Sequence, residues 1–271
     1  AKLEDKEPQL TQIWEETRNW SLEDFDQIYK WLGTEFDHVF YESEVDEEGK
    51  QLVIRGAKDG LFQKSDGAIG VDLIDEKLGF FLLLKSDGNT LYSTKDLALA
   101  KRKFEEFGIE RSIYVVGAEQ TLHFQQVFAT LKKMGYQQAS RCFHLPYALV
   151  VLPEGKMSSR AGNVILFSKL QQEMCDFVRN NYLESHRESW SDEEIESTTR
   201  KVAVAAIKYG MLNQDPNKQI TFSLKDWLVS EGDTGVYLIY AYVRIRSIVR
   251  QFENFDPQAE IEIGLLQPSH E

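Results

Sequence analysis

Apolar residues in the first part of the chain recur mainly at helical spacing. Between residues 10 and 33 they return every three or four positions, which predicts an amphipathic helix. Ser21, with Asp24 three residues later, is typical of a helix N-cap, so we expect two short helices here instead of one. Residues 36–54 have no clear period, and residues 51–55 are the segment most typical of a strand. The first part of the chain is therefore expected to mix helix and strand.

Short apolar runs then alternate with helical patterns. The runs 79–85, 112–116 and 142–152 are bounded by charged or turn residues and predict strands, the first of them buried on both faces. Residues 93–107 and 119–134 have helical spacing, and each segment is followed by a glycine. This order predicts parallel β-α-β units, which bind ligands at the carboxyl ends of their strands.

The pattern becomes helical after Pro153. Residues 167–182, 191–212 and 234–255 all have helical spacing. The second of these segments opens with Ser191 followed by Glu194, which is a capping-box signature. The chain is therefore expected to form an α/β domain to about residue 165, followed by helices.

The composition is that of a globular protein, with 42% apolar and 28% charged residues. No apolar run approaches about 18 residues, and the first residues lack the apolar centre of a signal peptide, so we expect neither a membrane span nor a secretory leader. Cys142 and Cys175 are the only cysteines, too few for a disulfide framework or a zinc site. These features predict a cytoplasmic protein without a resident metal.

The net charge of −13, from 44 acidic and 31 basic residues, does not exclude a nucleic-acid partner. Binding to phosphates depends on local patches more than on the charge of the whole chain. Basic residues gather in residues 101–103, 156–160 and 244–250. The charge balance thus permits nucleic-acid binding without arguing for it.

Residues 154–163 have the sequence EGKMSSRAGN and directly follow the third predicted strand. Lys156 and Arg160 supply cations, and Ser158 and Ser159 supply short donors, which are the groups that stabilise a polyphosphate. The spacing of a P-loop is absent. Because an ordinary basic surface loop has the same composition, composition alone leaves both interpretations open.

The order of the letters in this segment adds a resemblance. KMSS at 156–159 resembles the KMSKS signature of class I aminoacyl-tRNA synthetases. Residues 92–98 (YSTKDLA) and 117–124 (GAEQTLHF) resemble two segments of the arginyl-tRNA synthetases, and residues 231–235 (EGDTG) resemble the start of that family's helical anticodon-binding domain. Four motifs occur in the family's order over nearly the whole chain. On this basis the chain is identified as a member of the arginyl-tRNA synthetase family.

The resemblance implies an α/β fold that consists of the C-terminal half of a Rossmann-type parallel nucleotide-binding fold, followed by an α-helical region. It implies a helical and mixed insertion segment (1–88), the second half of the catalytic domain (89–165), a helical stem (166–220) and the start of the anticodon-binding domain (221–271). The family's His-x-Gly-His motif does not occur in these 271 residues. We therefore expect a fragment that lacks the N-terminal part and is inactive alone.

The resemblance also implies an activity. Enzymes of this family activate arginine with ATP, assisted by Mg²⁺, to arginyl-adenylate and then transfer the arginine to tRNA(Arg). The expected partners are therefore tRNA(Arg), arginine and ATP, with no membrane. Two alternatives remain: another class I synthetase or related adenylyltransferase, and a non-catalytic tRNA-binding or interaction module.

Individual residues receive roles from the same resemblance. The arginine-binding residues are matched by Tyr92, Asp96 and Gln120, and a carboxylate such as Asp96 suits a planar guanidinium. Lys156 and Ser158 are the candidate catalytic residues, although Ser159 stands where the family has a second lysine. The candidate ATP-binding residues are Gly117, His123, Lys156, Met157, Ser158 and Ser159.

Each of these residues has a simpler alternative role. Asp96 is also suited to the N-terminal turn of a helix, where a carboxylate complements the dipole. Tyr92 could be a core aromatic residue, Gly117 a plain strand-to-helix turn, Gln120 a plain helix-start residue, and His123 a packing residue. A group of tyrosines and arginines near the end of the chain fits either RNA stacking or one packed helix face. Its members are Tyr237, Tyr240, Tyr242, Arg244, Arg246 and Arg250.

Overall fold

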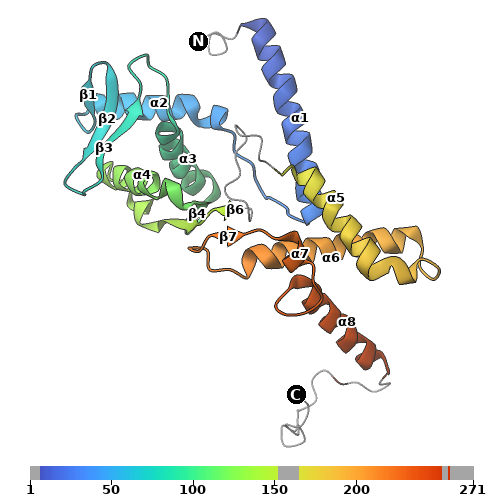
Figure 1. Cartoon of the computed structure of the whole chain (residues 1–271). Helices are drawn as coiled ribbons and strands as arrows, with labels where there is room; N and C mark the ends of the chain where they lie inside the picture. Colours follow the sequence, from blue (N-terminus) through green and yellow to red (C-terminus); the bar gives the residue numbers. More distant parts are fainter. Residues whose placement is uncertain (1–6, 152–164, 252–255, 257–271) are drawn as a thin grey trace, which may run out of the picture. The chain divides into compact units, whose positions relative to one another are not determined.

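The computed structural model describes residues 7–151, 165–251 and 256 (Figure 1). None of the helices in these ranges has the length and apolar character that crossing a bilayer requires. The chain forms two compact units. Unit 1 comprises Ala1–Gly162 and Gln214–Phe222, and unit 2 comprises Asn163–Asn213 and Ser223–Glu271.

Unit 1 begins with a single long helix, α1 (Pro8–Leu32), which ends at Gly33 in the left-handed conformation. The prediction of two short helices was wrong. Ser21 lies inside α1, and its hydroxyl donates to the backbone carbonyl of Thr17 (3.1 Å) instead of capping a new helix. Pro8 occupies the first turn, where its missing N–H costs nothing.

The second helix, α2 (Glu42–Lys58), contains the residues predicted to form a strand. That prediction was wrong because tertiary packing overrides local strand preference here. Leu52 and Val53 are buried against the sheet, and Gly49 lets α2 approach the next helix closely. A Cβ atom at Gly49 would lie 2.6 Å from the carbonyl oxygen of Thr94.

An antiparallel sheet follows, with strand order β1 (Gln63–Ser65), β2 (Ala68–Leu73) and β3 (Gly79–Leu84). The strand predicted at residues 79–85 is therefore present, but it does not belong to a parallel sheet. It is also not buried on both faces, because Phe80 and Leu82 are exposed while Phe81 and Leu83 are buried. Such alternation is typical of a sheet with one solvated face.

A β-α-β unit forms the second part of unit 1. Helix α3 (Tyr92–Phe107) ends at Gly108 and leads to β4 (Ser112–Gly117). The short helix η1 (Ala118–Gln120) and helix α4 (Thr121–Lys133) then return the chain through η2 (Gln137–Arg141) to β5 (Cys142–Tyr147).

Strands β4 and β5 pair in parallel, which confirms the prediction for this unit. A further short pair, β6 (Val150–Val151) with β7 (Ile220–Thr221), is also parallel. The structure is thus α/β, with small separate sheets among the described residues. Helix α4 makes the connection between β4 and β5 along the chain.

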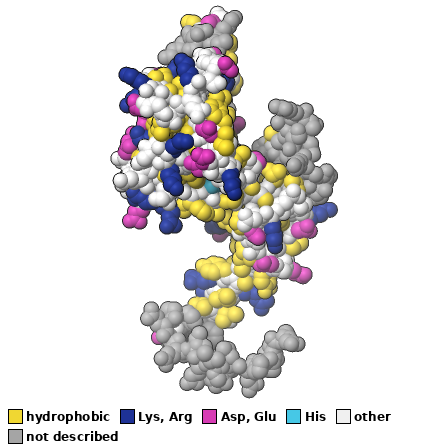
Figure 2. Space-filling model, turned by 90° about the vertical axis from the view of Figure 1, so that its left-hand side faces the viewer, with side chains coloured by type: hydrophobic (Ala, Val, Ile, Leu, Met, Phe, Trp, Pro, Cys, Tyr) yellow, Lys and Arg dark blue, Asp and Glu magenta, His cyan; other side chains and the backbone are white. Residues whose placement is uncertain are grey.

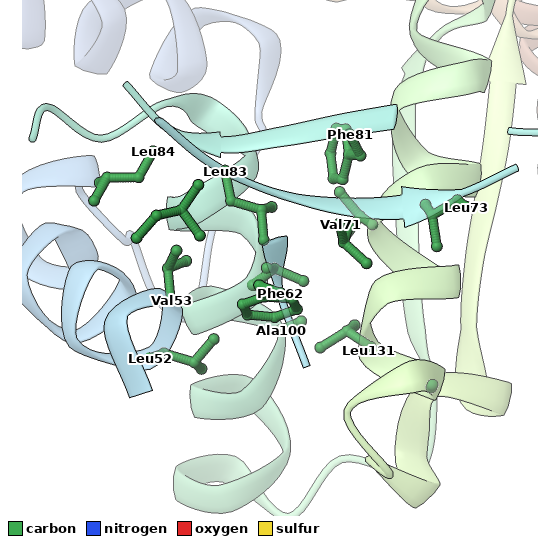
Figure 3. Packing of buried hydrophobic residues seen from close by; sticks show 14 residues of the cluster. Leu52, Val53, Phe62, Val71, Leu73, Phe81, Leu83, Leu84, Ala100 and Leu131 are labelled. Atoms are coloured by element: carbon green, nitrogen blue, oxygen red, sulfur yellow. The ribbon is translucent and has the colours of Figure 1, made fainter. Parts of the chain in front are cut away.

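The core of unit 1 lies between the antiparallel sheet and helices α2, α3 and α4 (Figure 3). Leu83 from β3 and Val71 from β2 have no exposed surface. They share the cluster with Val53, Ala100 and Leu131 from the three helices. This packing fixes the start of α3 relative to β3, and the candidate site is built on that junction.

Unit 2 is helical. Helix α5 (Phe167–Val178) continues through a π-helical turn (Arg179–Leu183) and the short helix η5 (Glu184–His186). The predicted capping box is confirmed at the start of α6 (Asp192–Leu212), where Ser191 and Glu194 bind each other's backbone N–H groups. The unit ends with α7 (Leu224–Trp227) and α8 (Gly235–Gln251).

Candidate functional site

The candidate site begins at the first turn of α3. The hydroxyl of Ser93 donates to the backbone carbonyl of Leu82 (2.7 Å), and that of Thr94 donates to the carbonyl of Leu83. The Thr94 hydroxyl also accepts a hydrogen bond from the N–H of Leu91 (3.1 Å). Two buried hydroxyl side chains thus tie the start of α3 to strand β3 and set the direction in which its outer residues point.

Tyr92 and Asp96 lie one turn apart on α3 and therefore share a face of the helix. Tyr92 is 71% exposed, so its role as a core aromatic residue is excluded. The side chain of Asp96 retains only 26% of its accessible surface. This face therefore presents an exposed phenol next to a carboxylate that is largely shielded from water.

Asp96 is joined to His123 of α4. The Nε2 atom of His123 lies 2.6 Å from Oδ2 of Asp96, and the histidine side chain is 23% exposed. The imidazole packs edge to face against Phe81 (5.6 Å between ring centres) and Phe124 (5.3 Å). Because the acceptor is a carboxylate, Nε2 carries the proton. The interaction joins the two helices of the site.

Gly117 and Gln120 lie where β4 ends and α4 begins. Gly117 is buried at the carboxyl end of β4, and a Cβ atom there would collide with the Glu119 carboxylate. Because these atoms are the end of a flexible side chain, a larger residue at position 117 would require Glu119 to move. Gln120 is exposed at the end of η1, one turn before His123. The hydroxyl of Thr121 donates to the carbonyl of Ala118 (2.7 Å) and closes the turn.

The structure brings some of the predicted residues together. Asp96, predicted for arginine, contacts His123, which was predicted for ATP. Tyr92 shares the helical face of Asp96, and Gln120 shares the β4–α4 turn with Gly117. The four candidates of the signature segment, Lys156, Met157, Ser158 and Ser159, lie outside the described residues.

Two further residues of this region were missed. Glu119 folds its carboxylate over Gly117, and it stands inside the GAEQTLHF segment, so its position in that motif was the available signal. Phe81 of strand β3 packs on the imidazole of His123 and lies 42 residues earlier in the sequence. No local pattern indicates such a contact.

A second polar group lies at the opposite end of β4. The Nζ atom of Lys103 donates to the Ser112 hydroxyl (2.8 Å) and lies 3.9 Å from the centre of the Tyr114 ring. Burial lowers the pKa of Lys103 and raises the pKa of Tyr114 and Cys142. The described residues contain no group of three or more side chains that could hold a metal ion.

The carboxylate of Asp96 is the group best placed to bind a cation at this site. Within the described ranges, Oδ2 accepts from His123, whereas Oδ1 has no hydrogen-bond donor. A carboxylate can accept two parallel hydrogen bonds from one planar cation. The arrangement therefore suits a ligand that presents such a cation near an exposed tyrosine.

Comparison with known proteins finds a matching family and similar sequences. Residues 1–224 match the family "tRNA synthetases class I (R), catalytic domain". An arginine-tRNA ligase of Bdellovibrio bacteriovorus is 46% identical over 251 residues, which is 93% of this chain and 43% of that protein. The corresponding protein of Bacteroides thetaiotaomicron is 38% identical over 253 residues, with 93% and 42% covered.

Two solved structures share the fold. The arginyl-tRNA synthetase of Plasmodium falciparum superposes with a TM-score of 0.78 at 24% identity, covering 94% of this chain and 43% of that one. The Thermus thermophilus arginyl-tRNA synthetase gives 0.76 at 23% identity, with 99% and 52% covered. At these identities the similarity concerns the fold alone. The chain spans less than half the length of the curated relatives described above.

Proposed function

The chain belongs to the class I arginyl-tRNA synthetase family, and from this premise we propose that it supplies the arginine site and part of the ATP site of a cytoplasmic synthetase. The enzyme would join arginine to ATP, release pyrophosphate and transfer the arginine to tRNA(Arg). In the proposed division, residues 89–165 belong to the catalytic domain and residues 221–271 begin the anticodon-binding domain. Residues 1–88 and 166–220 are proposed as insertion and stem.

The observation that carries the proposal is the oriented, largely shielded carboxylate of Asp96. Guanidinium recognition requires a planar carboxylate partner that accepts two hydrogen bonds. Tyr92, exposed one turn earlier on the same helix, is proposed to contact the aliphatic stem of the substrate. Gln120, whose side chain is a neutral amide, is proposed to bind arginine without adding charge to the site.

The ATP side of the proposal rests on the carboxyl end of β4 and on the signature segment. Gly117 allows a phosphate or ribose to approach the backbone. Lys156 and Ser158, with Met157 and Ser159, are proposed to stabilise the departing pyrophosphate. Mg²⁺ would accompany ATP and neutralise charge on its phosphates. These groups act by positioning and electrostatics, so no covalent protein intermediate is required.

A second candidate function follows from one observation. The His-x-Gly-His motif does not occur in these 271 residues, which favours a non-catalytic tRNA-binding module if the gene also lacks it. Both proposals expect this chain alone to show no arginine-dependent exchange of pyrophosphate with ATP. They differ for a full-length protein that contains the chain, because only the synthetase would then catalyse exchange when tRNA(Arg) is present.

The decisive experiment replaces Asp96 by Asn in such a full-length protein. The substitution keeps the shape but removes the charge that pairs with the guanidinium. Loss of one partner of a buried charge pair costs roughly 3–5 kcal/mol, so arginine-dependent exchange should fall by about a hundredfold or more at about 1.4 kcal/mol per decade. Asp24→Asn, on the exposed surface of α1, is the matched control. Unchanged arginine kinetics in Asp96→Asn would refute the proposed arginine site.

A further inference from the structure

We propose that His123 is a positioning residue for arginine, and that it acts by orienting the carboxylate of Asp96. This inference rests on the proposed function, in which Asp96 receives the guanidinium. His123 would donate its Nε2–H to Oδ2, leaving Oδ1 and the second lone pair of Oδ2 for the substrate. The resemblance to the family had placed His123 among the ATP ligands, whereas its 2.6 Å contact is with the candidate arginine residue.

The position of the imidazole is fixed by the rings around it. Phe81 of β3 and Phe124 of α4 both pack against it edge to face, with interplanar angles of 70° and 81°. Phe124 itself is 5% exposed, and Phe81 is 7% exposed. A histidine packed by two buried aromatic rings has few orientations available. Its Nε2–H is therefore a donor with a defined direction before any ligand arrives.

The carboxylate of Asp96 depends on the His123 donor for its orientation. No other residue in the described ranges forms a hydrogen bond or ion pair with Asp96, so His123 alone defines the plane of its carboxylate. A bidentate pair with guanidinium requires the two groups to be coplanar. Without the histidine, Asp96 would rotate among rotamers, and arginine would have to order it on binding. The expected consequence is weaker arginine binding with little effect on later chemistry.

A competing arrangement makes the opposite prediction. If His123 occupied the oxygen that the guanidinium needs, arginine would have to displace it, and removal of the histidine would tighten binding. Orientation is favoured over competition because a carboxylate oxygen can accept hydrogen bonds from two donors, so His123 and the guanidinium can share Oδ2. Oδ1 also has no donor within the described part of the chain.

Three substitutions at position 123 separate these possibilities in a full-length protein that contains this chain. His123→Phe keeps an aromatic ring between Phe81 and Phe124 but removes the donor. His123→Gln places an amide N–H at about the reach of Nε2, whereas the shorter side chain in His123→Asn does not reach Asp96. The KM for arginine, the KM for ATP and kcat are measured by pyrophosphate exchange with tRNA(Arg) present.

We expect the KM for arginine to rise about ten- to a hundredfold in His123→Phe and His123→Asn, the range for losing one hydrogen bond to a charged group. His123→Gln should recover most of this loss. The KM for ATP and kcat should change less than about threefold, which is within the usual context dependence of such effects. His38 packs against the rings of Phe40 and Phe107 and has no carboxylate partner among the described residues, so His38→Phe is a matched control.

Several outcomes would overturn the inference. A lower KM for arginine in His123→Phe would establish competition. Equal losses in the Gln and Asn variants would show that the imidazole only packs. A change confined to the KM for ATP would assign His123 to the nucleotide site instead.

The Asp96→Asn variant separates this inference from the proposed function. If Asp96→Asn is defective while His123→Phe is normal, only the role of His123 fails. If Asp96→Asn is itself normal, the arginine site fails as well. In the double variant, His123→Phe should add little to Asp96→Asn, because the two residues act as one unit.

Discussion

The two units of this chain bury their apolar residues in different ways. In unit 1, strands and helices distant in sequence enclose one cluster whose central members, such as Val71 and Leu83, have no exposed surface. In unit 2, α6 and α8 meet at Gly235, and an open groove of about 410 Å³ lies between them. Its lining is mostly apolar but includes Lys208 and Tyr209. Along α8, Leu238, Tyr242 and other apolar residues remain about half exposed or more. Figure 2 shows hydrophobic side chains, in yellow, on the surface in the lower part of the view.

The difference shows which interactions define each unit. Unit 1 depends on contacts between distant segments, so its structure follows from the cluster as a whole. Unit 2 combines a local feature, the capping box of α6, with a long-range contact, in which Gly235 of α8 packs against Ala205 of α6. Contiguous exposed apolar surface is typical of a face that another partner or segment covers. The comparison is tested by substitutions in the buried cluster of unit 1 and at α6 and α8 of unit 2.

The largest effect is expected in the cluster of unit 1. Leu83→Ala removes a fully buried side chain from β3 and leaves a cavity among side chains from several elements. The expected loss is about 2–5 kcal/mol of unfolding free energy. Leu82→Ala on the same strand is the control, because Leu82 is 38% exposed and should cost much less. Hydrogen exchange should show the loss of protection in peptides of unit 1, and equal effects of both changes would contradict the assigned core.

A smaller effect is expected where α8 meets α6. A Cβ atom at Gly235 would collide with the backbone carbonyl of Ala205, so Gly235→Ala should push the helices apart. The cost of such overpacking is about 1–3 kcal/mol, which exceeds the gain in helix propensity from Gly to Ala. Ser247→Ala, on the exposed part of α8, should not destabilise. A more stable Gly235→Ala protein would show that the helices do not pack as described. Thermal unfolding measures both variants.

Local signals in the sequence predicted several elements correctly. Ser191 and Glu194 identified the start of α6 because a capping box involves only four consecutive residues. Strand β4 and helix α4 followed from period and from the glycine after the helix, and the parallel pairing of β4 with β5 followed from their order. Each of these features depends on neighbours in sequence or on a general rule of connection.

Features set by distant contacts were not predictable in the same way. Residues 51–55 are rich in strand-forming residues, yet the packing of Leu52 and Val53 places them in a helix. In the site, the roles of Tyr92 and Asp96 came from the family resemblance, and they remain proposals. The contact of Asp96 with His123 spans 27 residues and joins two helices. No periodicity within either helix encodes that contact, so only the folded chain shows it.

The N-cap of α6 should have a moderate effect. Ser191→Ala leaves the N–H of Glu194 without its side-chain acceptor, which should cost about 1 kcal/mol, within a range of roughly 0.5–2. The loss should appear as faster hydrogen exchange in the first turns of α6, with little change in unit 1. Ser197→Ala, at an exposed position inside the same helix, is the control and should be neutral or slightly stabilising. Protection lost throughout unit 1 would contradict the local character assigned to the capping box.

The smallest effect is expected at the surface of unit 2. Glu196 accepts two hydrogen bonds from Arg179, at 2.6 and 2.9 Å, and the pair lowers the pKa of Glu196 below its ordinary value of 4.5. Because 60% of the Glu196 side chain is exposed, Glu196→Gln should cost only about 0.2–1 kcal/mol.

The pH dependence of this pair has a defined sign. Since the folded-state pKa is the lower one, the contribution of Glu196 is fully present above pH 4.5 and is lost as the pH falls through the lowered pKa. Unfolding of the two proteins in urea should therefore differ at pH 7 and converge in acid. A difference that grew in acid would contradict the assigned pair. Glu193→Gln, on the exposed first turn of α6, controls for the change in net charge.

The glycines of α2 have a consequence for the order in which the chain folds. Gly49 and Gly56 lie two turns apart, and each costs the isolated helix about 1 kcal/mol relative to alanine. The glycines stabilise the fold only when Thr94 of α3 and the ring of Phe62 pack closely against them. We therefore expect α2 to be a late helix, formed on a surface that α3 and β3 have already made. Weakening its contacts with α3 should then speed unfolding and leave the refolding rate nearly unchanged.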